Sequence, residues 1–86
     1  TKKLITDIKL IDKVYPNPFV DFINIELNEP APYVFKVFDL NGQLVKITKL
    51  NTKAIKINLP NLKSGQYILK VSNTNEELET IRLIKK

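Results

Sequence analysis

Acidic side chains are the first candidates for chemistry in this sequence, because the chain contains no His and no Cys. Their absence removes the commonest general base, every thiol nucleophile and zinc sites of standard composition. Glu76, Glu77 and Glu79 are spaced so that they could offer an acid and a base for glycoside hydrolysis. Nothing else in the chain indicates a substrate cleft, so a charged turn and strand edge is the favoured interpretation. We expect no catalytic residues and no enzymatic activity.

Asp39, Asn41 and Gly42 resemble part of a calcium-binding loop. Such a loop needs several further oxygen ligands and a terminal Glu at fixed spacing, and none follows here. Asp and Asn more often bond their own backbone, which predicts a turn at this position. Gly42 and Gly65 are the only glycines of the chain and cannot build a phosphate-binding loop. The sequence therefore predicts no metal and no cofactor.

The net charge of +5, from 14 basic and 9 acidic residues, raises the question of nucleic-acid binding. The basic residues do not form a cluster that would follow a phosphate backbone. Most are lysines placed singly within apolar segments, as is typical of solvent-facing or edge-protecting positions on strands. We expect no nucleic-acid partner and a monomeric domain.

The elements that must position these residues are strands, because apolar and polar residues alternate with a period of two between turns about 8 to 12 residues apart. This pattern predicts an all-β fold, a seven-stranded antiparallel immunoglobulin-like β-sandwich. The expected strands cover residues 4–14, 21–27, 33–40, 44–48, 54–59, 66–72 and 78–85. The residues expected in the core are Ile23, Ile25, Leu27, Val37, Ile57, Leu59, Tyr67, Leu69 and Val71.

Two of the turns between these strands carry specific signals. Pro16 and Pro18 fix an extended or turning backbone and interrupt the ladder after the first strand. Asn41-Gly42 is typical of a type I′ hairpin, because both residues accept a positive φ.

A third turn, Leu62-x-x-Gly65-x-Tyr67, lies just before a strand. A Tyr placed directly inside the strand after such a corner can return its hydroxyl to the preceding backbone. The spacing therefore predicts a tyrosine corner, with a plain core tyrosine as the alternative.

The chain has 86 residues, which fits one small domain. It begins with Thr1 and contains no Met, so we expect it to be part of a longer protein. Residues 1–7 are interpreted as a linker and residues 8–86 as the domain. No run approaches the roughly 18 to 20 apolar residues of a membrane helix, and the start lacks a signal-peptide pattern.

Four sequence blocks, in this order, resemble the type A C-terminal sorting domains of the type IX (Por) secretion system. The resemblance covers about residues 14 to 86. The blocks are Tyr15-Pro16-Asn17-Pro18-Phe19, the run from Val37 to Val45 around Asp39-Leu40-Asn41-Gly42, the run from Leu62 to Val71, and the ending Leu83-Ile84-Lys85-Lys86.

The resemblance implies a module that directs an attached upstream cargo protein through the type IX translocon to the cell surface. It implies passage through the periplasm, then an outer-membrane, cell-surface or extracellular location, and removal of the module by a surface sortase. The implied partners are translocon and sortase components and the fused cargo. The sorting-signal candidates are Pro16, Asn17, Pro18, Asp39, Asn41, Gly42, Leu62, Gly65, Tyr67, Leu83, Ile84, Lys85 and Lys86.

The chain end suggests how such a signal would be read. A terminal edge strand offers unpaired backbone groups and a free carboxylate, which a partner can capture by strand addition or carboxylate recognition.

The alternative function is a fibronectin type III-like accessory module that binds carbohydrate or protein. Tyr15, Phe19 and Tyr33 would form its exposed aromatic platform. An exported structural spacer is a third possibility.

Overall fold

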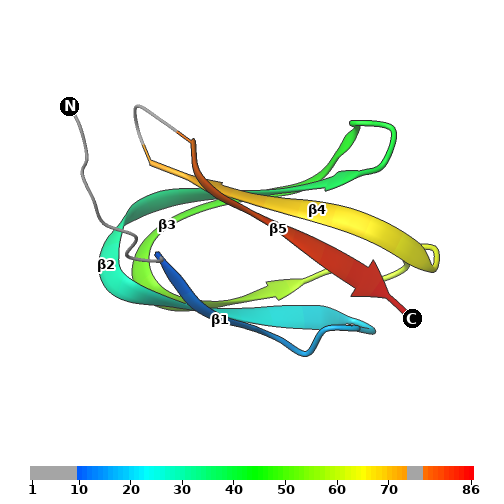
Figure 1. The fold of residues 1–86 in the computed structure, drawn as a ribbon, viewed down its shortest axis with the longest axis horizontal. Helices are drawn as coiled ribbons and strands as arrows, with labels where there is room; N and C mark the ends of the chain where they lie inside the picture. The colour runs from blue at the N-terminus through cyan, green and yellow to red at the C-terminus, as the bar shows by residue number, and fades with distance from the viewer. Residues whose placement is uncertain (1–9, 74–76) are drawn as a thin grey trace.

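Five antiparallel strands form one sheet in a computed structural model that describes residues 10–73 and 77–86 (Figure 1). Alternating apolar and polar residues produce these strands, because successive side chains of a strand point to opposite faces of the sheet. No helix in the described part of the chain could span a membrane. The strands are β1 (Ile11–Tyr15), β2 (Phe22–Asp39), β3 (Leu44–Asn58), β4 (Gly65–Ser72) and β5 (Glu77–Lys85).

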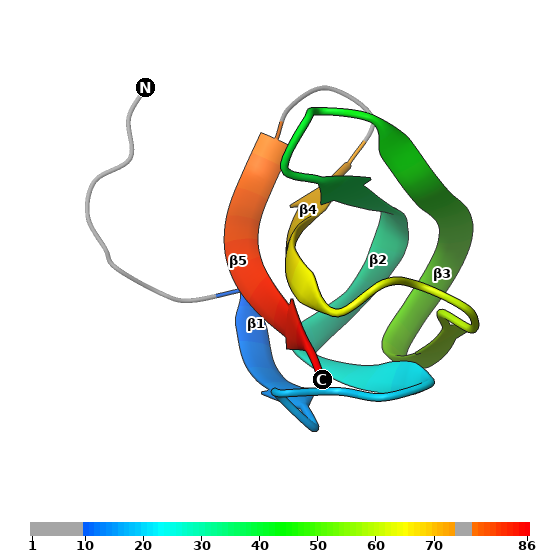
Figure 2. The same ribbon diagram turned by 90° about the vertical axis from the view of Figure 1, so that its right-hand side faces the viewer.

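The sheet curls because its central strand, β2, has different partners along its length. The strand order is β1-β2-β4-β5, and β3 pairs with β2 along its other edge. β1 pairs with the first part of β2, from Asn24 to Leu27, whereas β4 pairs with the last part, from Val34 to Asp39. The curl brings β1 and β5 to the same side of the molecule, as Figure 2 shows.

The prediction of seven strands is wrong, because two of the expected interruptions remain part of the sheet. Residues 28–32 lie within β2 and residues 51–53 within β3. Ala31 pairs with Thr52 and Pro32 with Asn51, and a register shift between Glu26 and Ala31 takes up the bend. Turn-forming residues thus bend two long strands without ending them. Of the first expected strand, residues 4–9 lie outside the described residues, as does the expected linker 1–7.

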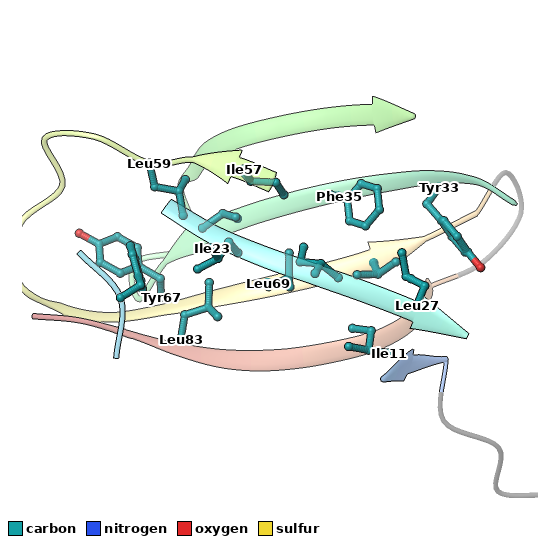
Figure 3. Close-up of a cluster of buried hydrophobic side chains, with 14 residues drawn as sticks. Ile11, Ile23, Leu27, Tyr33, Phe35, Ile57, Leu59, Tyr67, Leu69 and Leu83 are labelled. Carbon is teal, nitrogen blue, oxygen red and sulfur yellow. The ribbon is translucent and has the colours of Figure 1, made fainter. Parts of the chain in front are cut away.

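The predicted core is confirmed, because all nine residues expected inside are buried (Figure 3). The sequence interpretation did not assign five further buried residues to the core. Two of these, Phe19 and Tyr33, were proposed as parts of an exposed aromatic platform, and that proposal is wrong: only Tyr15 of the three is exposed. The five are Ile11, Phe19, Tyr33, Phe35 and Leu83.

The central position of Leu69 allows a direct test of this core. Leu69 is fully buried on β4, so Leu69→Ala should lower the free energy of unfolding by about 2 to 5 kcal/mol. Leu50→Ala is the matched control, because Leu50 is 48% exposed on β3 and should change stability by less than about 0.5 kcal/mol. Chemical denaturation followed by circular dichroism measures both. Equal losses for the two variants would contradict the assigned core.

Candidate functional site

The proline loop near the start of the chain is attached to the last strand by one side chain. The Asn17 amide donates from Nδ2 to the Arg82 carbonyl at 3.1 Å and accepts the Ile84 N–H through Oδ1 at 3.0 Å. A single amide therefore satisfies one acceptor and one donor on the outer edge of β5, as a neighbouring strand would. Pro16 and Pro18, each after a cis peptide bond, flank Asn17.

Phe19 continues this attachment with its backbone. Its N–H donates to the Ile84 carbonyl at 2.8 Å, and its carbonyl accepts the Lys86 N–H at 2.9 Å. The two bonds form an isolated parallel bridge between Phe19 and Lys85. The Phe19 ring is fully buried and meets the Tyr67 ring edge-on, with centroids 6.3 Å apart. The proline loop and the chain end thus share one hydrogen-bonded and packed contact.

The last part of the β5 edge, from Arg82 onward, is consequently not free, which corrects the expectation of unpaired backbone groups at the chain end. Asn17 and Phe19 occupy backbone groups from Arg82 to Lys86. The Lys85 ammonium donates to the main-chain oxygen of Lys86 at 3.1 Å. Simple strand addition at this edge would require the proline loop to leave it.

The tyrosine corner is confirmed. The Tyr67 hydroxyl donates to the Lys63 carbonyl at 2.8 Å, four residues upstream. Leu62 packs against the core from the same connection, and Gly65 begins β4 with a φ of +144°, a conformation that side chains disfavour. These contacts fix the path by which the chain enters β4.

Removing the corner bond gives a testable loss. Tyr67→Phe keeps the ring and deletes the hydroxyl, which leaves the Lys63 carbonyl without this partner. We expect the free energy of unfolding to fall by about 1 kcal/mol. Tyr15→Phe is the control, since the Tyr15 hydroxyl bonds Glu26 at the exposed surface. Thermal unfolding compares the two variants, and an equal or larger loss for Tyr15→Phe would contradict a stabilising corner.

The central turn is built by Asp39. Its Oδ1 accepts the N–H groups of Asn41 and Gln43, both at 2.9 Å. The Gly42 N–H donates to the Asp39 carbonyl at 3.1 Å, and Gly42 has a φ of +86°. The side chain–backbone turn is as predicted, but the type I′ geometry is wrong. Asn41 has no positive φ, so Leu40 and Asn41 are the central residues and Gly42 follows them in the left-handed region.

Strand pairing brings all four sequence blocks to one end of the molecule. Asp39 pairs with Tyr67, Tyr67 with Leu83, and Gly65 with Lys85. Asn17 and Phe19 contact the same part of β5. We call this end of the molecule, which contains Asn17, Phe19, the turn at Asp39, Gly65, Tyr67 and residues 83–86, the block end. In Figure 1 it lies at the right, beside the C-terminus.

The opposite end holds a second tyrosine corner that the sequence interpretation missed. The Tyr33 hydroxyl donates to the Glu29 carbonyl at 2.7 Å, again four residues upstream. Burial, and secondarily the negative charge of Glu29, raise the pKa of Tyr33 above its ordinary value. The spacing Glu29-x-x-x-Tyr33 matches that of Lys63 and Tyr67, so the repeated interval was the available signal.

Three described carboxylates, those of Glu26, Asp39 and Glu79, bond other groups of the fold. Of the three glutamates considered above as an acid and a base, Glu76 and the side chain of Glu77 lie outside the described part of the chain. Glu79, considered above as a possible acid or base, accepts the Ile11 N–H at 3.0 Å through Oε1 and links β5 to β1. The described residues contain no cluster of three or more acidic side chains that could hold a metal ion.

Comparisons with known proteins agree with this geometry. A relative, ulvan lyase NLR42 of Nonlabens ulvanivorans, is 38% identical over 72 residues, which is 83% of this chain and 14% of the lyase. A structure of PorZ, a surface component of the type IX secretion system of Porphyromonas gingivalis, superposes with a TM-score of 0.73 at 26% identity and covers 88% of this chain and 11% of PorZ.

A BSP domain of a biofilm-associated protein shares the fold, with a TM-score of 0.67 at 19% identity, over 88% of this chain and 15% of that one. The chain thus spans only a small part of each of these proteins. The fold is immunoglobulin-like, as predicted, but the described residues form one curled sheet of five strands where a seven-stranded sandwich was expected. The family model of the secretion system C-terminal sorting domain matches residues 13–86, and the chain belongs to that family.

Proposed function

We propose that the block end is the part of this sorting domain that the type IX translocon recognises. The family is one of sorting signals, and membership implies export to the cell surface or the extracellular space. The observation that carries the proposal is the direct contact between the first and last blocks. Asn17 and Phe19 bond Arg82, Ile84 and Lys86, although more than 60 residues separate them.

A rigid end of this kind is better suited to being recognised by a partner protein than to catalysing a reaction. Its residues are held by backbone pairing, a buried Phe19–Tyr67 ring contact and a turn closed by Asp39, so its shape is set before any partner arrives. Preorganised surfaces bind with a smaller loss of conformational entropy. The domain would act as a monomeric ligand for the secretion machinery, without catalytic residues, metal or cofactor.

The remaining features of the route are parts of the same proposal. A cargo protein precedes the domain, residues 1–7 link the two, and the fusion crosses the periplasm before a surface sortase removes the domain. The ulvan lyase supports this arrangement, because the matched segment makes up only 14% of that protein.

The fibronectin-like binding alternative loses its main support. Its platform required exposed Phe19 and Tyr33, and these side chains are 0% and 3% exposed. Family membership favours the sorting function over it.

A passenger fusion tests the proposal. Residues 1–86 are placed behind a passenger that carries a Sec signal peptide, in a host with type IX machinery. We expect the passenger at the cell surface or in the medium, measured by surface proteolysis and immunoblotting of culture fractions. The same passenger without the domain is the control and should remain in the periplasm. Periplasmic retention of the complete fusion would refute the proposed function.

A further inference from the structure

The outer face of the sheet carries an apolar row beside the central turn. Leu44, Phe38, Ile68 and Arg82 are direct neighbours across β3, β2, β4 and β5. Directly paired residues of antiparallel strands place their side chains on the same face. Tyr67 and Val37, next to Ile68 and Phe38 along the chain, point into the core instead, so this row faces outward.

Exposed apolar side chains lie on both sides of the row, with Leu40 toward the hairpin tip and Ile47 opposite Lys36 on the other side. Leu40 is 64% exposed, Leu44 49% and Ile47 45%. Phe38, Leu40, Gly42 and Ile68 line a shallow depression of about 330 Å³ together with Asp39 and Lys70. We call the surface formed by Phe38, Leu40, Leu44, Ile47 and Ile68 the outer patch. Clustered exposed apolar surface of this kind marks interaction sites more often than scattered single residues do.

Apart from Asp39 in the turn, the charged side chains beside the outer patch are positive. The neighbouring row on the same face, two residues away along β2 and β4, consists of Ile47, Lys36, Lys70 and Thr80. The two rows together hold three cations, Lys36, Lys70 and Arg82, and no carboxylate. Asp39 lines the depression, but its Oδ1 already accepts two backbone N–H groups of the turn.

We propose that the outer patch, which lies mainly on the outward face of the second and third blocks, is a docking surface of this domain and that it receives an acidic protein surface of the secretion machinery, with an apolar side chain seated in the depression. Charge complementarity supports an acidic partner. It argues against a second copy of this chain, because two patches of like charge would repel each other. The depression between Phe38, Leu40 and Ile68 offers a seat for one protein side chain, which is why we favour a protein partner. The inference rests on the proposed sorting function.

Export of the passenger fusion tests the apolar and charged parts separately. Leu40→Gln with Ile68→Gln removes the apolar contact, and Lys36→Glu with Arg82→Glu reverses the charge. Each pair should lower the exported fraction at least about fivefold, as for residues at the centre of an interface. Arg82→Glu leaves in place the Arg82 carbonyl that Asn17 bonds.

Matched variants elsewhere on the sheet provide the controls. Leu50→Gln is an exposed apolar change outside the patch, and Lys56→Glu reverses a lysine that lies over the Phe22 ring, 4.4 Å from its centroid. Both controls should export within about twofold of the wild type. Thermal unfolding of each purified domain shows whether the variant is folded. If the apolar pair fails to fold, the charge pair still tests the docking surface, because its two substitutions lie on the outer face of the sheet.

The outcomes separate this inference from the proposed function. Retention of the wild-type fusion refutes the sorting function, whereas normal export of folded patch variants refutes only the docking surface. Loss of export in the apolar pair alone overturns the acidic partner. Two binding measurements test the other possible occupants. If the domain cosediments with phosphatidylglycerol vesicles and Arg82→Glu abolishes this binding, the occupant is a lipid surface. If the domain forms a dimer and Leu40→Gln makes it monomeric, the occupant is a second copy of the chain. Either result overturns the proposal.

Discussion

Deletion of Leu83–Lys86 is expected to abolish export of the passenger fusion and to lower the free energy of unfolding by at least about 3 kcal/mol. The structure explains both effects. Leu83 is fully buried, and the deleted backbone pairs with β4 on one side and with Asn17 and Phe19 on the other. A natural domain of this length is stable by only about 4 to 13 kcal/mol, so the loss is a large fraction of the total.

Two neighbouring substitutions separate recognition from folding in this experiment. Leu83→Ala removes a buried side chain and should cost about 2 to 5 kcal/mol, with export falling because the domain unfolds. Ile84 points outward and is 43% exposed, so Ile84→Gln should change stability by less than about 0.5 kcal/mol. We expect Ile84→Gln to reduce export nonetheless, because it alters the surface of the block end. If both the Ile84→Gln fusion and the deletion were exported normally, the sorting signal would lie outside residues 83–86.

An extension of the chain tests the terminal carboxylate. A few Gly and Ser residues after Lys86 displace the carboxylate but leave the Lys86 N–H bond to Phe19 in place. We expect the extended fusion to be exported like the wild type, measured in the same culture fractions. Loss of export would show that the carboxylate itself is recognised and would contradict a signal made by the block end alone.

Local patterns in the sequence predicted the local features of this fold. The alternation Ile23, Ile25, Leu27 placed those residues in the core, and the spacing of Gly65 and Tyr67 predicted the corner, because strand periodicity and turn chemistry depend on neighbouring residues. The interruption expected between residues 27 and 33, where Pro30 and Pro32 lie, does not end the strand. A proline removes one ladder bond, but whether the strand stops or bends depends on partners far away in sequence.

The assembly of the block end lay beyond such patterns. The burial of Phe19 results from its contact with Tyr67, and the role of Asn17 depends on the backbone of β5. Both are contacts between segments far apart in sequence, and neither has a local signature. The sequence supplied the four blocks and their order, whereas their proximity became visible only in the curled sheet.

Phe19→Ala is the other variant with a large expected effect. The ring is fully buried between the proline loop and Tyr67, so its removal should lower the free energy of unfolding by about 3 to 5 kcal/mol. Tyr15→Ala is the matched control at the edge of the same loop, because Tyr15 is 42% exposed and should cost much less. Denaturant unfolding measures both. Similar losses for the two variants would show that Phe19 does not anchor the loop.

Asn17→Asp separates the attachment of the loop from its packing. Asp keeps an acceptor for the Ile84 N–H but loses the donor to the Arg82 carbonyl, and its charge lies against that carbonyl oxygen. We expect the free energy of unfolding to fall by about 1 to 3 kcal/mol. The domain should still fold, but its export should be reduced because the contact between the first and last blocks is altered. Asn51→Asp is the control for the added charge, because Asn51 lies at the bend of β3, where it pairs with Pro32. If the folded Asn17→Asp fusion is exported as well as Asn51→Asp, the contact between the two blocks stabilises the domain without forming part of the signal.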